Sequence, residues 1–588
     1  MIGKSEKIEE RSNSLPADER DRRVLELYEQ VVEIEQRLIP TGLHVFGRAA
    51  DASERADMLR MVASFDRPEA NARALPDMVA EGLGLGEYTK LLETSRQMEA
   101  HLSERERVDE IVHAAIELFI NKDREAASLW LEEIANVKRE ESHPVFTLLS
   151  RICEQLSVSH ELESLMRALR GEYIEPGPGA DIVQNPDILP TGRNTHAINP
   201  YIVPSEIAYT RAERVVTGLL ERHLSEHARY PRAMALVLWG LDNIKTQGEG
   251  VAQALWLLGV RPLRDAMNRA TGIEIIPLEK LGRPRIDVVM TVSGIFRDLF
   301  GATMNLLDKA VRAVAVLDEP EEMNYVRRNI LEQMKADGCG MDEAALRVFS
   351  NAPGNYGTNV NFMVMDSQWE QDDTLGDLFV TRKCFAYGRD AAGRAVEGLE
   401  ARRAFDRALE RVEAAYQNID TFEIGITDVD HYFEYLGGVT KAVEKRAKKR
   451  PAVYLSDTLS RDLKIRSIEE TVRLETRAKT LNPKWYEGML KHGFRGVAEI
   501  ESHISNTFGW SATTDAVDDW VYTEVANTFV LDEEMLERLR ALNPHSARSL
   551  VARLLEAHGR GFWAAEAQVL ERLREIFSGL EDQLEGLA

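Results

Sequence analysis

Cysteine is nearly absent from this chain, and its scarcity excludes two kinds of architecture. Cys153, Cys339 and Cys384 are the only cysteines in 588 residues, and no Cys-x-x-Cys spacing occurs. A disulfide framework or a structural zinc knuckle needs several cysteines at short, regular spacings. Both are therefore excluded, and a reducing compartment is expected.

Long apolar runs are missing as well. No stretch reaches the roughly 18 apolar residues that a membrane-spanning helix requires. The first residues, MIGKSEKIEERSNSLPADERDRR, are charged and lack the apolar core of a secretory signal. We therefore expect a cytoplasmic protein without a transmembrane segment.

Positive charge is in short supply. Lysine and arginine number 73 against 98 aspartates and glutamates, which gives a formal net charge of −25. Such an acidic surface repels polyphosphate, so no nucleic-acid partner is expected. A complete phosphate-binding loop is also lacking, because Gly3-Lys4-Ser5 has no glycine five residues before its Gly-Lys pair. ATP hydrolysis by that route is not expected.

The first part of the chain is helical by pattern. Apolar residues recur at helical spacing between Leu25 and Leu38, and again over 107–120 and 145–169. These repeats predict a helical region over residues 1–170. Residues 171–205 then hold six prolines and four glycines, which exclude a regular element over that stretch. An ordered crossover and a functional loop are both compatible with it.

The rest of the chain mixes strands and helices. MALVLWG (234–240) and DVVMTVSG (287–294) are apolar runs bounded by glycine and followed by helical patterns, which predicts an α/β domain with candidate cleft loops over 206–370. Residues 371–588 are predicted to be a mainly helical domain with short strands, one at 452–457. The predicted fold class is therefore mixed α/β and helix-rich: a helical N-terminal region, a central α/β layered region and a mostly helical C-terminal region.

One apparent zinc motif is better explained as helix surface. His223-Leu-Ser-Glu226-His227 fits H-x-x-E-H, which places two imidazoles on one helix face. A catalytic zinc needs a third protein ligand, and the sequence shows none. The surrounding residues are typical of a solvated helix end stopped by Pro231.

Polar side chains flank the two predicted buried strands. Lys245 and Glu249 follow the first strand, where the loops of α/β sheets usually bind ligands. Arg283 precedes the second strand and Arg297 follows it. Their guanidinium groups suit carboxylates such as the propionates of a tetrapyrrole, but the residues alone favour an arginine–aspartate network that fixes a domain interface.

Two further segments carry polar groups. The loop RVFSNAPGNYGTNVNF (347–362) contains Asn355 and Tyr356, which can line a polar pocket or form an ordered turn. The segment GITDVDHYFEYLGG (425–438) gathers three carboxylates around one imidazole. A few oxygen ligands suit a weakly held Mg²⁺ that keeps its water, and a helix cap with a solvated face is the alternative. These residues are Asp428, Asp430, His431 and Glu434.

Taken together, these segments resemble a known family. The resemblance runs almost end to end through LIPTGLHVFG, PDILPTGRNTHAINPYIVPS, LWGLDNIKTQGEG, LGRPRIDVVMTVSGIFRDLF, SNAPGNYGTNVN, TDVDHYFEYLGG, LNPKWYEGMLKHGFRG and EAHGRGFWAAE. These blocks are similar to the large, H-type subunits shared by magnesium chelatase and aerobic cobaltochelatase. PTGRNTHAINPY and the ending RLREIFSGLEDQLEGLA look more like the magnesium branch.

The resemblance implies an enzyme subunit, of the ligase class that forms nitrogen–metal bonds, in (bacterio)chlorophyll biosynthesis. Protoporphyrin IX and Mg²⁺ are the implied substrates, and two smaller AAA+ subunits are the implied partners that use ATP. The expected catalytic residues are Asp428, His431 and Glu249, and the expected metal-binding residues are Asp428, Asp430 and Glu434. The expected porphyrin-binding residues are Arg283, Arg297, Lys245, Asn355 and Tyr356.

One departure from the family is expected to matter. Its full-length members carry a long amino-terminal portion ahead of LIPTGLHVFG, and this chain lacks it. The chain is therefore expected to be the carboxy-terminal half, inactive without its partner subunits and the missing portion; it is either a fragment, or a second polypeptide completes it. A cobaltochelatase half acting on a corrin precursor and a non-catalytic tetrapyrrole carrier are the alternatives.

Overall fold

The structure is a computed structural model that divides into two compact units. It describes residues 42–95, 99–179, 181–196, 198–370, 373–390, 392–419, 421, 424–458 and 463–587, with Leu27, Val31 and Ile34. The first unit comprises Met1–Leu38 and His44–Thr195, and the second comprises Ile39–Leu43 and His196–Ala588. Each unit has a hydrophobic core of its own.

The first unit is helical, as its apolar periodicity predicts. Its helices are α3 (Ala52–Ala63), α4 (Leu75–Gly82), α5 (Tyr88–Ser95), α6 (Glu99–Asn121), α7 (Arg124–Ala135), α8 (Arg139–Leu156) and α9 (Glu161–Leu169). The Asp51 carboxylate starts α3 by accepting from the Glu54 amide, and the Glu54 carboxylate accepts from the Asp51 amide in return. The periodicity at 107–120 falls inside α6, and that at 145–169 spans α8 and α9. The segment from Leu25 to Leu38 lies almost wholly outside the described residues.

Residues 171–205 contain short elements, two of which pair as strands, so the prediction that no regular element forms there is wrong at those two places. They contain β1 (Pro176–Pro178), η2 (Pro186–Ile188), β2 (Asn194–His196) and η3 (Pro200–Ile202). The Arg193 guanidinium donates to the carbonyl oxygens of Asp187, Ile188 and Leu189. The prolines thus limit each element to three residues, while one arginine collects the carbonyl groups that no strand or helix satisfies.

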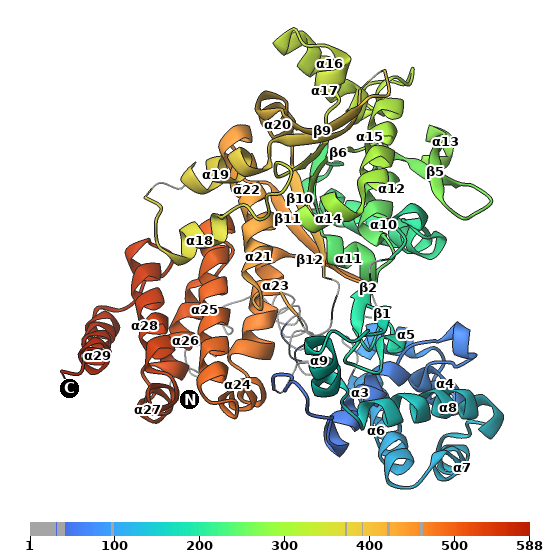
Figure 1. The fold of residues 1–588 in the computed structure, drawn as a ribbon, viewed down its shortest axis with the longest axis vertical. Helices are drawn as coiled ribbons and strands as arrows, with labels where there is room; N and C mark the ends of the chain where they lie inside the picture. Colours follow the sequence, from blue (N-terminus) through green and yellow to red (C-terminus); the bar gives the residue numbers. More distant parts are fainter. Residues whose placement is uncertain are drawn as a thin grey trace, which may run out of the picture. The chain divides into compact units, whose positions relative to one another are not determined.

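A mixed eight-stranded sheet organises the described part of the second unit (Figure 1). Its order is β12-β11-β10-β3-β6-β7-β8-β9, with the five strands from β11 to β7 parallel and the others antiparallel. The strands are β3 (Ala233–Leu238), β6 (Asp287–Val292), β7 (Val348–Ser350), β8 (Phe385–Arg389), β9 (Ala395–Glu400), β10 (Ala414–Ile419), β11 (Ala452–Asp457) and β12 (Lys464–Ser467). The strands predicted at 234–240, 287–294 and 452–457 are confirmed as β3, β6 and β11.

The structure differs from the domain boundary predicted at residue 370. The sheet joins strands from both sides of that position, and residues 196–588 form one unit. Two partners of β3 explain the difference, because β6 follows it by about 50 residues and β10 by about 180 along the chain. Parallel pairing over such separations leaves no local trace in the sequence.

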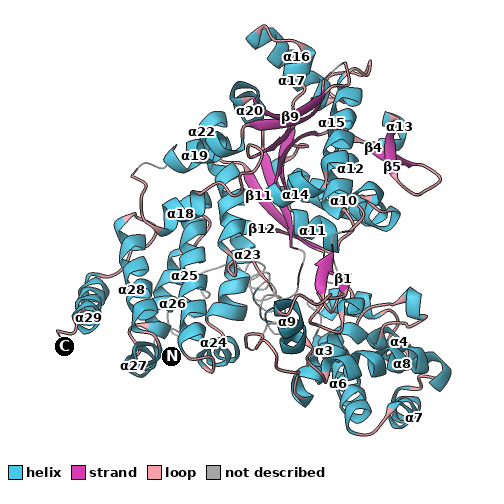
Figure 2. Ribbon diagram, viewed as in Figure 1, coloured by secondary structure: helices cyan, strands magenta, loops and turns pink. Residues whose placement is uncertain are grey.

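Helices cover both faces of the sheet (Figure 2). In β3, Met234, Leu236 and Leu238 enter one core, and Ala233, Ala235 and Val237 enter the other. A parallel strand buried on both faces is apolar throughout, which explains its unbroken run. Helices on the first face are α10 (Glu206–His227), α12 (Glu249–Leu258), α15 (Gly301–Ala315) and α16 (Tyr325–Asp337); those on the second include α18 (Val360–Met365), α19 (Asp373–Lys383), α20 (Arg402–Leu409) and α22 (Gly438–Ala447).

The remaining elements complete the second unit. A hairpin follows α12 and is formed by β4 (Val260–Arg264) and β5 (Ala270–Ile275). Short helices at loops are α11 (Gly240–Lys245), α13 (Leu278–Leu281), α14 (Gly294–Leu299), α17 (Met341–Ala344) and α21 (Asp430–Tyr432). The carboxy-terminal helices, several of which extend the second core, are α23 (Ile468–Glu475), α24 (Pro483–Leu490), α25 (Phe494–Thr514), α26 (Asp519–Phe529), α27 (Glu533–Leu542), α28 (Pro544–Gly559) and α29 (Ala567–Leu584).

The strand order places a topological switch point at β3. From β3 the chain adds β6 and β7 on one side, and later returns to add β10 and β11 on the other. In such doubly wound sheets the loops at the carboxyl ends of the strands diverge here and leave room for ligands. The loops that begin at Trp239, Ser293 and Asn351 all leave this edge.

A buried ion pair fastens the amino end of β6. The Arg347 guanidinium donates to both oxygens of Asp287 at 2.9 and 3.1 Å, and the Asn329 amide donates to the same carboxylate at 2.9 Å. Arg347 and Asp287 are both about 1% exposed. Each charge therefore depends on its partner for solvation.

We expect Arg347→Met to lower the free energy of unfolding by about 3–5 kcal/mol, because it leaves the Asp287 carboxylate buried and without its cation. Urea denaturation of the chain measures the change. Arg394→Met, which removes a side chain 81% exposed and paired with Asp390, is the control and should cost less than about 1 kcal/mol. Equal costs for the two variants would contradict the prediction.

Candidate functional site

One carboxylate joins two of the polar segments. Glu434 lies in the π-helical turn η4 (Phe433–Gly437), and its side chain is 1% exposed. Its Oε1 accepts from the Thr358 hydroxyl at 3.0 Å, from the Asn359 amide at 2.9 Å and from the Thr358 amide. The loop after β7 is therefore folded onto the 425–438 segment. Gly357 permits the approach, since its φ is +68° and a Cβ there would lie 3.1 Å from Glu434 Oε1.

The other oxygen of Glu434 orients His431. His431 Nδ1 lies 2.8 Å from Glu434 Oε2 and 3.6 Å from Asp430 Oδ1, and the side chain is 60% exposed. The hydrogen bond that His431 donates to Glu434 raises the pKa of His431. Burial acts to raise the pKa of Glu434, but the bonds from His431 and Thr358 outweigh it and hold that pKa below its ordinary value. A carboxylate at Nδ1 keeps the proton there, which leaves Nε2 as the basic position.

Arg297 reaches the same loop from the end of β6. Its Nη1 donates to the carbonyl oxygens of Ala352 at 2.9 Å and Asn355 at 2.8 Å, and its Cζ lies 5.1 Å from the centre of the Tyr356 ring. Asp298 accepts from Arg297 Nε at 2.7 Å and from the Tyr356 hydroxyl. The Nη2 atom is buried and lacks a hydrogen-bond partner in the described part of the chain. The two N–H groups of Nη2 thus remain for a ligand.

A buried lysine completes this edge of the sheet. Lys383 Nζ donates to Val292 O and Asn351 Oδ1, both at 2.9 Å, and lies 4.0 Å from the centre of the Tyr435 ring. Burial lowers its pKa well below the ordinary value. Sequence reasoning missed Lys383, which lies at the end of α19 without any motif. It lies two residues before β8, a strand that was not predicted from the sequence.

The structure thus brings together six of the predicted site residues: Arg297, Asn355, Tyr356, Asp430, His431 and Glu434. Asp430 is tied to the same loop, because the Asn361 amide donates to its Oδ2 at 2.6 Å. These residues follow β6, β7 and β10, which are separated by more than 50 residues along the chain. Their meeting is a consequence of the sheet.

Asp428 has a different role in the structure from Asp430 and Glu434. Its Oδ1 lies 2.7 Å from His503 Nε2, and its Oδ2 accepts from Lys479 and from the Gly425 amide. Burial acts to raise the pKa of Asp428, but His503 and Lys479 hold it well below the ordinary value. The carboxylate is thus already paired with Lys479 and His503. Through these contacts Asp428 holds the loop to which it belongs, next to α25 and the segment that carries Lys479.

The predicted metal ligands do not form one cluster. Asp428 pairs with side chains of α25 and of the π-helical turn η5 (Thr476–Thr480), whereas Glu434 accepts from the loop after β7. Throughout the described ranges, no group of three histidine, cysteine, aspartate or glutamate side chains is arranged to hold a metal ion. A metal site formed by all three carboxylates therefore remains a prediction, and the observed positions of these side chains do not favour it.

Arg283 lies away from the other predicted porphyrin-binding residues. It precedes β6, and its guanidinium donates to the carbonyl oxygens of Leu257 and Trp256, which end α12. Arg297 leaves the opposite end of β6, a six-residue strand that spans about 20 Å. The two arginines cannot hold neighbouring carboxylates of one small ligand. Arg283 instead caps a helix, as arginines at helix carboxyl ends do.

Glu249 and Lys245 belong to the first face of the sheet. Lys245 ends α11 and is half-buried, and Glu249 begins α12 and is 3% exposed. Burial raises the pKa of Glu249 to about 7. Glu249 packs on the side of α10 and α12, whereas Glu434 and Tyr435 belong to the second core. The structure therefore does not bring Glu249 to His431.

The zinc-like motif on α10 is more buried than its sequence predicts. His223 is 2% exposed, and its Nδ1 lies 3.4 Å from the Tyr454 hydroxyl on β11. Burial lowers the pKa of His223 to about 4. Glu226 accepts from the same hydroxyl at 2.5 Å. The motif fastens α10 to the sheet, because its residues face Tyr454.

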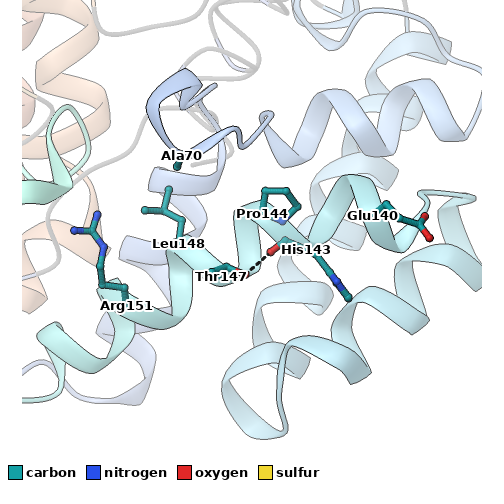
Figure 3. A pocket seen from close by; sticks show the side chains of 7 residues that line it. All are labelled: Ala70, Glu140, His143, Pro144, Thr147, Leu148 and Arg151. Carbon is teal, nitrogen blue, oxygen red and sulfur yellow. Dashed lines mark hydrogen bonds between the residues drawn. The ribbon is translucent and has the colours of Figure 1, made fainter.

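An open hollow of about 650 Å³ lies in the first unit (Figure 3). It runs along α8 past Ala70 of the turn η1 (Pro68–Ala70), and the Thr147 hydroxyl beside it donates to the His143 carbonyl. None of the predicted site residues lines it. Its lining residues are Ala70, Glu140, His143, Pro144, Thr147, Leu148 and Arg151.

The sheet and its loops define a helix-rich, doubly wound α/β protein with polar groups gathered at one edge. The sequence model of the family CobN/Magnesium Chelatase matches residues 3–570, and the chain belongs to that family. It is 43% identical over its whole length to magnesium-chelatase subunit ChlH, chloroplastic, of Oryza sativa subsp. indica. It is 37% identical, over 68% of its length, to aerobic cobaltochelatase subunit CobN of Sinorhizobium sp.

A solved structure confirms the predicted fold class. The chain is similar to the catalytic subunit of cobaltochelatase from Mycobacterium tuberculosis, with a TM-score of 0.87 and 30% identity over 96% of the chain. The chain covers 47% of that protein and 44% of the rice subunit. It therefore spans less than half the length of these relatives. None of the described helices combines the length and apolar composition needed to cross a bilayer.

We expect Glu249→Gln to stabilise the chain by about 2–3 kcal/mol more at pH 8 than at pH 5, with EDTA present. An unfolded glutamate titrates near pH 4.5, and burial raises the folded pKa to about 7. Between pH 4.5 and about pH 7, folding therefore takes up a proton at Glu249. The free energy of unfolding of the wild type falls as the pH rises through this range. The neutral amide avoids this loss. Urea denaturation at both pH values measures it, and a pH-independent difference would contradict the prediction.

Proposed function

We propose that this chain is part of the porphyrin-binding subunit of a magnesium chelatase and takes part in ATP-dependent insertion of Mg²⁺ into protoporphyrin IX, in (bacterio)chlorophyll biosynthesis. The observation that supports this most is the 43% identity with the rice magnesium-chelatase subunit across the whole chain. The CobN subunit matches over a shorter part and at lower identity. The higher identity to the rice subunit and the longer matched part of the chain both favour the magnesium branch.

Metal insertion requires two pyrrole protons to leave the ring while a hydrated Mg²⁺ sheds water. His431 is suited to accept such a proton. Its Nδ1 is held by Glu434, which leaves Nε2 to act as the base on a side chain that is 60% exposed. The buried carboxylate then stabilises the imidazolium that forms. We assign proton acceptance to His431 and its orientation to Glu434; Asp428 positions the loop.

Arg297 is suited to hold a propionate of the porphyrin. Its guanidinium is fixed by two carbonyl oxygens and by Asp298, and the N–H groups of Nη2 are unused. Tyr356 lies over its face and is 55% exposed, so displacement of this ring opens the guanidinium to a ligand. Arginine binds carboxylates through paired donors, which suits a substrate that carries two. Asn355 and Lys245 stay predicted porphyrin contacts.

The partners follow from the same proposal. Two AAA+ subunits supply ATP hydrolysis, which drives the closure that removes water from the ring and the metal. The relatives are more than twice as long as the chain, so sequence corresponding to their remainder contributes to the whole enzyme. The chain acts within that assembly.

A second candidate is insertion of cobalt into a corrin precursor. The likeness to the Mycobacterium tuberculosis cobaltochelatase subunit supports it, at 30% identity over 96% of the chain. The two candidates differ in metal and in macrocycle. Parallel assays with Mg²⁺ and protoporphyrin IX, and with Co²⁺ and a corrin precursor, separate them.

We expect His431→Asn to lower the rate of Mg²⁺ insertion about 100-fold or more, because a positioned base contributes roughly 10²–10⁴ in rate. The assay contains the chain, the remaining part of the large subunit, both AAA+ subunits, ATP, Mg²⁺ and protoporphyrin IX, and follows the Soret band. His227→Asn, on α10, is the control and should keep the wild-type rate. An undiminished rate for His431→Asn would remove this residue from the reaction.

A second prediction concerns the propionates. The same large subunit should bind protoporphyrin IX about 10-fold or more tightly than its dimethyl ester, since hydrogen bonds to a charged group contribute about 1.5–3 kcal/mol. Arg297→Met should abolish this preference, and Arg283→Met, at the opposite end of β6, should retain it. Fluorescence titration measures both affinities. Equal effects of the two variants would show that Arg297 does not select the carboxylate.

A further inference from the structure

A buried cation contacts three separate segments of the candidate site. Lys383 ends α19 and is 0% exposed. Its Nζ donates to Val292 O and to Asn351 Oδ1, both at 2.9 Å, and lies 4.0 Å from the centre of the Tyr435 ring. Two oxygen atoms and one ring face match the three N–H groups of an ammonium, whereas a neutral amine would turn its lone pair toward the electron-rich ring. The contacts therefore indicate a charged lysine.

The first contact lies where the chain leaves β6. Val292 is the last residue of β6, and α14, which carries Arg297, begins two residues later. The Val292 carbonyl accepts from Lys383 and also from the Ser350 hydroxyl at 2.9 Å. These two donors fix the orientation of the last peptide of the strand. They thereby fix the start of the helix that carries Arg297.

The second contact closes the loop after β7. Asn351 is fully buried, and its Nδ2 donates to Gly357 O at 2.5 Å and to Arg382 O at 3.2 Å. Lys383 binds the oxygen of the same carboxamide, so it fixes the direction in which the amide nitrogen faces. The loop that Asn351 closes is the one whose carbonyl oxygens accept from Arg297.

The third contact reaches the turn that orients the proposed base. Tyr435 follows Glu434 in η4, and its ring lies against Lys383 Nζ. The Oε2 atom of Glu434 lies 2.8 Å from His431 Nδ1. Burial lowers the pKa of Lys383, and the negative charge of Glu434 opposes that shift. The ring and the carboxylate of one turn thus both stabilise the same cation.

We propose that Lys383 is a positioning residue that couples the guanidinium of Arg297 to the base His431. The inference rests on the proposed function for the roles of these two residues. Lys383 is fully buried and acts through Asn351 and Tyr435. Carboxylate binding and proton acceptance then require the same arrangement of the three segments, so a ligand held by its carboxylate meets a base that is already oriented.

Hydrogen–deuterium exchange of the chain tests the coupling without any substrate. Lys383→Met keeps the length of the side chain and removes the ammonium, and methionine suits a buried position. We expect the amides of 293–297, 357–359 and 433–437 to exchange about 10-fold or more faster in the variant, because each segment loses one contact. The amides of β3 should keep their protection. Unchanged exchange in any of the three segments, or an acceleration that includes β3, would overturn the proposal.

Lys445→Met is the matched control. Lys445 is a half-buried lysine of α22 that also contacts α19, because its Nζ lies 2.8 Å from Asp377 Oδ2. Exchange in the three segments should equal that of the wild type. A response equal to that of Lys383→Met would assign the change to loss of a charge on this face of the sheet, and would contradict the proposed role of the three contacts.

The complete enzyme gives the coupling a kinetic signature. Lys383→Met should lower the affinity for protoporphyrin IX and the insertion rate at saturating substrate, each by about 10-fold or more. Combined with Arg297→Met it should weaken binding no further, and combined with His431→Asn it should slow insertion no further. Additive losses in either pair would show a merely structural role and overturn the proposal. An inactive wild-type assembly would count against the proposed function instead, because the exchange experiment needs no substrate.

Discussion

The site depends on one buried carboxylate with four donors. Glu434 draws the loop after β7 onto the 425–438 segment through the Thr358 hydroxyl and the amides of Thr358 and Asn359. Its remaining oxygen receives His431. A buried carboxylate is stable only when its oxygens are satisfied, so the loop and the imidazole are held for the same reason. The same carboxylate thus holds the loop in place and orients the proposed base.

Residues at the carboxyl ends of the strands pack around Glu434. Trp239, at the end of β3, packs against Tyr435 with ring centres 4.5 Å apart and donates to Gln417 at 3.2 Å. It therefore lies on the second face of the sheet at the switch point, while Glu249 lies on the first face. The apolar strands thus bring these polar groups together at one edge of the sheet.

Local sequence pattern was sufficient to predict β3, β6 and β11, because a strand buried on both faces is apolar throughout. It was insufficient for the boundary at residue 370, since the pairing of β10 with β3 has no local signal. Arg283 was misplaced although the sequence held the clue: it precedes β6 and Arg297 follows it, so the two lie at opposite ends. The ion pairs of Asp428 come from side chains more than 50 residues away.

The central claim is that Glu434 holds the loop after β7, and hydrogen–deuterium exchange of the chain tests it directly. In Glu434→Gln the neutral amide is a weaker acceptor for the amides of Thr358 and Asn359. Peptides that contain these two residues should exchange faster in the variant, while those of β3 and β6 keep their protection. Unchanged exchange at Thr358 and Asn359 would contradict the account.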